Sequence, residues 1–179
     1  IILRLGSVYG FSNDAMRINI MPNLFSKIAS QNGTIKLFAA GKQLKSLVSV
    51  VDTVRCMKYM EENDNLKNEI FHLVKEQTTV KKVAEICKKI NPYLKIKSTN
   101  DEIPNEGYTL SNQKILKTGF KFLYNLEESI KEMIYQWKYE KDKKRLEQIF
   151  KGENEFIDNR GKISNFELTE PINLIGYIE

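Results

Sequence analysis

Residues that build reactive or cross-linked sites are scarce in this sequence. Its 179 residues include two cysteines and a single histidine. Cys56 and Cys87 have no CxxC or Cys/His spacing, which excludes the usual cysteine motifs. We interpret both as small apolar core residues in a reducing compartment. His72 has no cysteine or carboxylate at a useful spacing, so we expect a buried structural histidine rather than a catalytic one.

Long apolar runs are also absent. The longest, such as residues 47–51, are far too short to cross a bilayer, and the first residues lack the basic flank and cleavage site of a signal peptide. We therefore expect no membrane association and a cytoplasmic location. The net charge of +5 comes mostly from lysines scattered over expected helix faces, without interleaved aromatic residues. This pattern predicts a solvated surface and no nucleic-acid partner, and it is compatible with an anionic small ligand.

An apolar strand opens the chain and leads directly into a polar turn. Residues 1–10 are Ile-Ile-Leu-Arg-Leu-Gly-Ser-Val-Tyr-Gly, and the hydrophobic share of 41% is typical of a globular protein. Continuous apolar strands are typical of parallel sheets buried on both faces, and ligands bind beyond the carboxyl ends of such strands. We therefore expect an α/β fold in which Leu5 to Tyr9 lie beside a ligand. Because the chain starts within this pattern, we expect the rest of a nucleotide-binding α/β enzyme to precede it.

Hydrophobic periodicity and turn residues predict the remaining elements. Expected helices cover 20–29, 52–62, from Thr78 or Thr79 to 90, and 125–137, with one helical turn at 113–117. Expected strands cover 35–38, 45–51 and 69–74, with short extended pieces at 94–98 and 108–111. Asp52 is the expected N-cap of the second helix, whose residues Val54, Met57 and Met60 should face the core.

The last quarter of the chain changes character. Residues 139–151 are highly charged and predict a helical extension or linker. Residues 152–179 alternate in the manner of strands, with turn signals at 158–161 and 170–171, which indicates the first strands of a separate β domain.

Five segments occur together in the order and spacing of one enzyme family. They are Leu-Arg-Leu-Gly-Ser-Val-Tyr-Gly at 3–10, Asn-Ile-Met-Pro at 19–22, Ile-Lys-Leu-Phe at 35–38, Lys-Ser-Leu-Val-Ser-Val-Val-Asp at 45–52, and Tyr-Thr-Leu-Ser-Asn-Gln-Lys at 108–114. Residues 1–138 thereby resemble the C-terminal half of the NAD-dependent nucleotide-sugar epimerase/dehydratase family, the extended short-chain dehydrogenases. The resemblance implies part of a Rossmann-type domain with its small substrate-binding α/β lobe.

The resemblance implies a set of residues that hold the diphosphate and the sugar. Lys45 matches a diphosphate-binding Arg, and Asn19 matches an Asn that meets the diphosphate. Ser7 falls where many epimerases place a substrate-contacting Asn, and Gly6 would lie beside the nicotinamide ring. Tyr108 corresponds to a Tyr near the diphosphate.

The same resemblance assigns the base of the nucleotide to residues 35–38, where Lys36, Leu37 and Phe38 would contact the substrate. Two positions depart from the family. Lys45 keeps the positive charge of the family's Arg without its bidentate fork. Asp101 lies where a second phosphate-contacting Arg is common.

The catalytic elements of the family are missing from this sequence. No glycines form a GxxGxxG turn, and the strings Tyr93 to Lys97 and Tyr139 to Lys143 lie outside the context of a catalytic Tyr-x-x-x-Lys helix. We therefore expect the catalytic residues and most NAD (or NADP) contacts to precede Ile1, and this chain alone to be inactive. A homodimer of the full-length protein fits the family.

Without the resemblance, several of these residues fit purely structural roles. Lys45 could be an ordinary surface charge, Phe38 a core residue, and Ser7 and Asn19 turn residues. The favoured function is the nucleotide-sugar-binding portion of an NAD-dependent epimerase or dehydratase, and the alternative is a non-catalytic nucleotide-sugar-binding or scaffold protein. Residues 156–163 and 172–178 resemble the opening strands of cupin-type sugar epimerases, which implies a second sugar-modifying domain.

Overall fold

The computed structural model describes residues 1–12, 15–100, 106–150, 154–158 and 161–165, with side chains described up to residue 143. Two compact units divide the chain, Ile1–Trp137 and Lys138–Glu179. Among the described residues, no helix combines the length and the apolar character that a membrane span requires.

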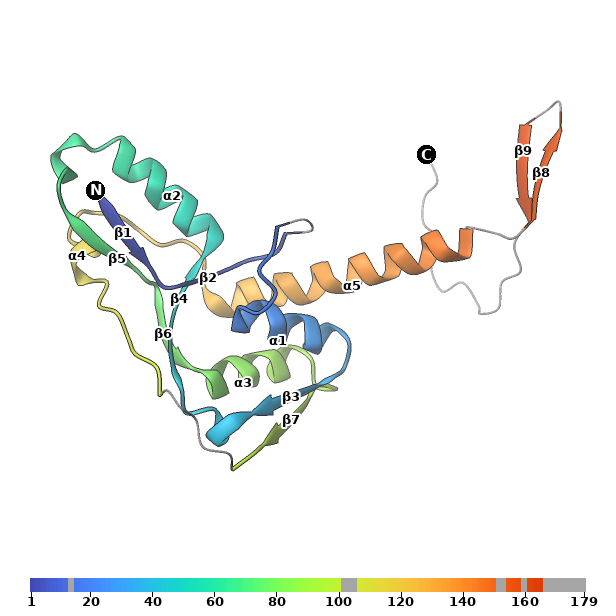
Figure 1. Cartoon of the computed structure of the whole chain (residues 1–179), viewed down its shortest axis with the longest axis horizontal. Helices are drawn as coiled ribbons and strands as arrows, with labels where there is room; N and C mark the ends of the chain where they lie inside the picture. Colours follow the sequence, from blue (N-terminus) through green and yellow to red (C-terminus); the bar gives the residue numbers. More distant parts are fainter. Residues whose placement is uncertain (13–14, 101–105, 151–153, 159–160, 166–179) are drawn as a thin grey trace. The chain divides into compact units, whose positions relative to one another are not determined.

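Parallel strand pairs organise the first unit (Figure 1). β1 (Ile2–Leu5) pairs in parallel with β5 (Ile70–Leu73), and β2 (Ser7–Tyr9) pairs in parallel with β4 (Leu44–Ser49). β4 also pairs antiparallel with β6 (Glu76–Thr79), and β3 (Thr34–Leu37) pairs in parallel with β7 (Lys95–Ser98). The expected mixed α/β fold with parallel strands is confirmed.

The opening strand is divided at Gly6, where the chain leaves β5 and joins β4. The Gly6 amide donates to the Leu73 carbonyl at 3.1 Å, and the next residue, Ser7, is already in register with Leu47. The expectation that this strand is buried on both faces is wrong for β1, whose Ile2 and Leu5 are exposed. Among the described residues β1 has one neighbouring strand, so its other edge and part of its faces remain open.

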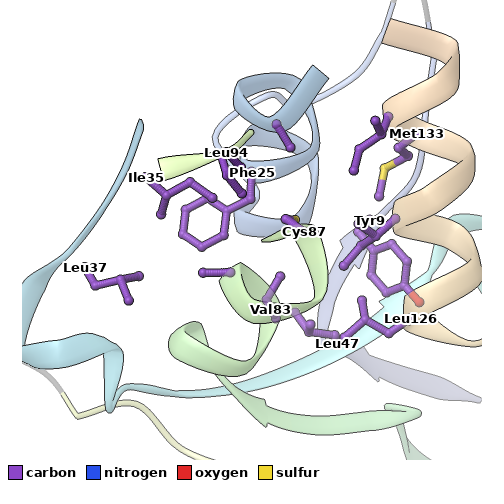
Figure 2. Packing of buried hydrophobic residues seen from close by; sticks show 14 residues of the cluster. Tyr9, Phe25, Ile35, Leu37, Leu47, Val83, Cys87, Leu94, Leu126 and Met133 are labelled. Carbon is purple, nitrogen blue, oxygen red and sulfur yellow. The ribbon is translucent and has the colours of Figure 1, made fainter. Parts of the chain in front are cut away.

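The helices pack against these strands and form two hydrophobic clusters with them. α1 (Met21–Ser30), α3 (Val80–Ile90) and the first part of α5 (Leu126–Phe150) pack against β2, β3 and β4, as Figure 2 shows for Phe25, Val83 and Met133. α2 (Val50–Glu61) and α4 (Gln113–Leu116) cover β5 and the second cluster. Cys56 and Cys87 are fully buried, one in each cluster, which confirms their interpretation as core residues.

Helix α2 differs from its expected start and orientation. Ser49 is its N-cap, because the Ser49 hydroxyl accepts from the Asp52 amide at 3.1 Å, and Asp52 therefore lies within the first turn. The expected inward positions of Val54 and Met57 are wrong, since they are 60% and 49% exposed, whereas Met60 is buried as expected. The buried face instead follows the 3.6-residue period through positions 52, 53, 56 and 60.

Other segments match the expected pattern more closely. Thr79 caps α3 by accepting from the Lys82 amide at 3.2 Å, and Asn125 caps α5 by accepting from the Glu128 amide at 2.8 Å.

The sequence pattern does not predict β6, because its residues Glu-Gln-Thr-Thr are polar. Residues 108–111 form no strand, and an isolated bridge joins Leu44 to Gly107 instead. The short 3₁₀ helices η1 (Phe38–Gly41) and η2 (Asp64–Leu66) complete the unit.

The second unit contains the charged end of α5 and a β-hairpin. The hairpin consists of β8 (Asn154–Asp158) and β9 (Gly161–Asn165), with Asp158 opposite Gly161 in an antiparallel register. This register fits the turn expected at 158–161, whose residues 159 and 160 lie outside the described residues. The turn expected at 170–171 lies outside the described residues.

Candidate functional site

A pocket of about 590 Å³ opens where β1 ends and β2 and β4 begin. Four short segments contribute its lining, which consists of Leu5, Gly6, Ser7 and Val8, then Arg17 and Ile20, then Leu44, Lys45 and Ser46, and finally Gly107, Tyr108 and Leu110. These segments are far apart in the sequence, and the parallel pairing of β2 with β4 brings the first and third together.

The wall formed by residues 106–110 is held in place by hydrogen bonds to β4 and β6. The Ser46 hydroxyl accepts from the Leu110 amide at 3.0 Å, and the Leu44 amide donates to the Glu106 carbonyl at 2.8 Å. The Gln77 side-chain amide also donates to the Leu110 carbonyl at 2.9 Å. Tyr108 therefore has a fixed backbone while its side chain remains exposed.

Positive charge dominates the polar lining of this pocket. Lys45 and Arg17 both line it, and no carboxylate among the described residues does. Within the part of the chain that the structure describes, neither cation forms an ion pair. A cation that no carboxylate neutralises attracts anions, and the attraction is stronger where protein replaces part of the surrounding water. The pocket therefore suits a negatively charged ligand.

The structure brings together four of the residues that the sequence resemblance assigned to the site. Gly6, Ser7, Lys45 and Tyr108 line this one pocket. Asn19 is exposed in the turn before α1 and is not part of the lining.

Residues of the expected base-binding segment lie elsewhere. Alternation along β3 turns Leu37 into the core, where it is 2% exposed, and leaves Lys36 outside. Phe38 begins η1 and is 52% exposed, so the alternative that it is a core residue is wrong. None of the three lines the pocket, and their contact with a nucleotide base stays a prediction. Asp101 lies outside the described residues.

Arg17 is a lining residue that the local sequence pattern does not mark. It lies in a polar loop without helical or strand periodicity, next to the matching segment at 19–22. Its nearness to that segment, within a few residues, is the one signal in the sequence that points to it.

Tyr9, which the sequence pattern places beside the ligand, lies in the core instead. Its side chain is buried in the cluster shown in Figure 2, and burial raises the pKa of its phenol. A phenol held neutral in this way does not supply a catalytic base.

Among the described residues no group of three or more metal-binding side chains occurs. His72 is half-buried on β5 beside Arg4. The glycine at position 6 is explained by the sheet itself, since a Cβ there would lie 2.6 Å from the Ser46 carbonyl oxygen. Its expected place beside a nicotinamide ring stays a prediction.

A second, larger hollow of about 920 Å³ lies between α3 and α5. Its lining mixes both charges, including Glu85, Lys89 and Lys131, and an ion pair of 2.6 Å joins Lys89 to Glu127 across it. This balance of charge does not select an anion.

No family model matches the sequence. Solved structures do resemble the chain. UDP-glucose 4-epimerase from Thermotoga maritima, solved with UDP-glucose, matches with a TM-score of 0.65 at 22% identity over 78% of this chain. UDP-glucuronic acid 4-epimerase from Bacillus cereus, solved with UDP-glucuronic acid and NAD, matches with 0.64 at 17% identity over 78%. The dTDP-glucose 4,6-dehydratase from Bacillus anthracis, solved with NAD, matches with 0.59 at 16% identity over 79%.

The chain spans less than half the length of these structures, 45% of the two epimerases and 44% of the dehydratase. At such identities the likeness concerns the fold. The chain thus has the architecture of a part of the Rossmann-type extended short-chain dehydrogenase fold.

Proposed function

We propose that this chain is the nucleotide-sugar-binding portion of an NAD-dependent nucleotide-sugar epimerase or dehydratase. The observation that carries the proposal is the placement of Lys45, Ser7 and Tyr108 around one pocket whose described lining holds no carboxylate. A diphosphate needs cations and hydrogen-bond donors, and a sugar needs hydroxyl partners. The fold similarity to epimerases and a dehydratase of nucleotide sugars supports the same conclusion.

Three of the lining residues have a chemical role in this proposal. The Lys45 ammonium neutralises the diphosphate as a point charge, and the Ser7 hydroxyl and Tyr108 phenol donate to the sugar or the phosphates. NAD (or NADP), held mainly by residues outside this chain, would provide the chemistry of hydride acceptance that sugar oxidation needs. The base and the cofactor loop come from residues outside this chain, so the chain holds the substrate but does not turn it over.

Replacing Lys45 tests this function. In Lys45→Ala, binding of UDP-glucose should weaken by about 1.5–3 kcal/mol, since a hydrogen bond to a charged group contributes that much. Isothermal titration calorimetry measures the change, and Lys117→Ala, an exposed lysine that does not line the pocket, is the matched control. Equal affinities of wild type and Lys45→Ala would remove Lys45 from the site.

The alternative, a non-catalytic nucleotide-sugar-binding or scaffold protein, uses the same pocket. The two functions differ in the full-length protein incubated with a nucleotide sugar and NAD. The enzyme produces an epimerised or dehydrated sugar, whereas the scaffold binds the nucleotide sugar and leaves it unchanged.

We also propose that residues 152–179 begin a cupin-like β domain. The antiparallel β8–β9 hairpin supports the β character of this region. The cytoplasmic location and a homodimer of the full-length protein stay predictions.

A further inference from the structure

We infer that Arg17 is a second anion-binding side chain of the pocket and that the buried side chain of Asn23 positions it. This inference rests on the proposed function, because it concerns the same diphosphate. Neither residue is among those that the sequence resemblance marks.

The charge of a diphosphate calls for a second cation. A diphosphate carries more negative charge than the single ammonium of Lys45 neutralises, and Lys45 lacks the planar fork that binds two phosphate oxygens at once. Arg17 lines the same pocket and forms no ion pair among the described residues. Its guanidinium supplies the missing fork from a different segment of the chain.

A buried asparagine holds the backbone of Arg17 in place. Asn23 lies in the first turn of α1 and is 2% exposed. Its Oδ1 accepts from the Gly10 amide at 3.0 Å, and its Nδ2 donates to the Arg17 carbonyl at 3.2 Å. The Ile20 amide donates to the same carbonyl at 3.2 Å.

One buried amide therefore connects both ends of the loop between β2 and α1. The Asn23 Oδ1 holds Gly10, where the chain leaves β2, and the Asn23 Nδ2 holds the backbone of Arg17. An asparagine side chain does both because it carries one acceptor and one donor group, which neither an aspartate nor an apolar side chain offers. Gly10 and Arg17 thus keep a defined distance, and the pocket keeps its second cation without any contact to the guanidinium itself.

The pair of cations also predicts ligand selectivity. Two cations from two segments fit two phosphate groups better than one, so UDP-glucose should gain more from Arg17 than UMP does. Loss of Arg17 should reduce the preference for a diphosphate over a monophosphate.

Calorimetric titration of the full chain with UDP-glucose and with UMP tests the role of Arg17. Arg17→Ala should weaken UDP-glucose binding about 10-fold, the low end for a charged hydrogen bond at an exposed position, and weaken UMP binding less. Arg17→Lys should recover part of the loss. The matched control is Arg4→Ala, since Arg4 is exposed on β1 and does not line the pocket.

Asn23 is tested by combining variants. If Asn23 acts by positioning Arg17, Asn23→Ala weakens UDP-glucose binding in the wild-type background and adds nothing in the Arg17→Ala background. A general loss of structure would weaken binding in both backgrounds and overturn the positioning role. Circular dichroism checks folding, and if Asn23→Ala does not fold, Asn23→Asp replaces it because it keeps the acceptor for Gly10 and removes the donor to Arg17.

The outcomes separate this inference from the proposed function. If Lys45→Ala weakens UDP-glucose binding and Arg17→Ala does not, the proposed function stands and the inference is wrong. If the wild-type chain binds neither UDP-glucose nor UMP, both fail.

Discussion

Gly6 lines the pocket and packs closely against its neighbours in the fold. The chain crosses from β5 to β4 at this residue, with the Ser46 carbonyl oxygen 2.6 Å and Val74 Cγ2 3.0 Å from where a Cβ would lie. Ser46 lies in β4 and Val74 directly follows β5, and both are buried, so neither neighbour moves aside easily. Ser46 also anchors the wall at 108–110, which links the packing at Gly6 to the shape of the site.

We therefore predict that Gly6→Ala both destabilises the protein and weakens its ligand binding. Overpacking of this kind costs about 1–3 kcal/mol of the free energy of unfolding. Urea denaturation measures the stability change, and titration with UDP-glucose measures the affinity. An unchanged unfolding midpoint would show that the sheet accommodates the methyl group and would contradict the tight packing of Gly6 against Ser46.

Sequence alone predicts part of the pocket lining, namely the residues that belong to segments with a local pattern. It misses residues whose position depends on contacts with other segments. Ser7 and Lys45 belong to strands whose local pattern and order carry the resemblance, so they could be predicted. Arg17 belongs to a loop without a pattern, and its placement depends on a side chain in the following helix. Alternation along β3 buries Leu37 and leaves Lys36 outside, because successive side chains of a strand point to opposite faces. The contact of Leu37 with a base stays a prediction.

At the scale of elements, helix α2 shows how one buried side chain decides the orientation of a helix. Asp52 has no exposed surface, and its carboxylate accepts from the amides of Leu123 and Tyr124, each at 3.1 Å. Its Oδ1 also pairs with Arg55 at 2.6 Å. Satisfying these donors requires the Asp52 face of the helix to point inward, which leaves Val54 and Met57 outside. The two amides lie 71 and 72 positions away, so local periodicity could not indicate this orientation.

We predict that Asp52→Ala is strongly destabilising. Two backbone amides lose their acceptor, and each unsatisfied donor costs about 1–3 kcal/mol. Urea denaturation should show a loss of that order, whereas Glu62→Ala, which removes an exposed pair of 3.7 Å with Lys58, should change stability by less than about 0.5 kcal/mol. Similar effects of the two substitutions would contradict the anchoring role of Asp52.

At the scale of the whole molecule, two cores support the unit that carries the site. Each core holds one fully buried thiol, and burial raises the pKa of Cys56 to about 11 and that of Cys87 to about 12, from the ordinary 9.0. Above pH 9 the unfolded chain loses these protons while the folded protein keeps them. The stability that the neutral thiols contribute is therefore complete below pH 9 and decreases as the pH rises toward 11 and 12.

The corresponding experiment is urea denaturation at pH 8 and at pH 10.5. The free energy of unfolding should be lower at pH 10.5, and the decrease should be smaller in the double variant Cys56→Ala/Cys87→Ala, which lacks both thiols. An equal decrease in both proteins would assign the alkaline loss to other groups.

The first unit carries the candidate pocket, and the chain spans 45% of the length of the two epimerase structures that it resembles. The α/β architecture could be predicted from the sequence because parallel strands and amphipathic helices have local signatures. Two features could not be predicted, the splitting of the opening strand at Gly6 and the edge of β1 that has no partner among the described residues. Both depend on which strands lie side by side.

We propose above that the pocket at β1, β2 and β4 binds the diphosphate of a nucleotide sugar. Nuclear magnetic resonance titration of the ¹⁵N-labelled full chain with UDP-glucose tests it most directly. We predict saturable shifts of the backbone amides of Gly6, Ser7, Lys45 and Tyr108, with little change at Lys89 and Lys131 in the hollow between α3 and α5. Shifts confined to that hollow, or no shifts at the four pocket residues at saturating UDP-glucose, would contradict it.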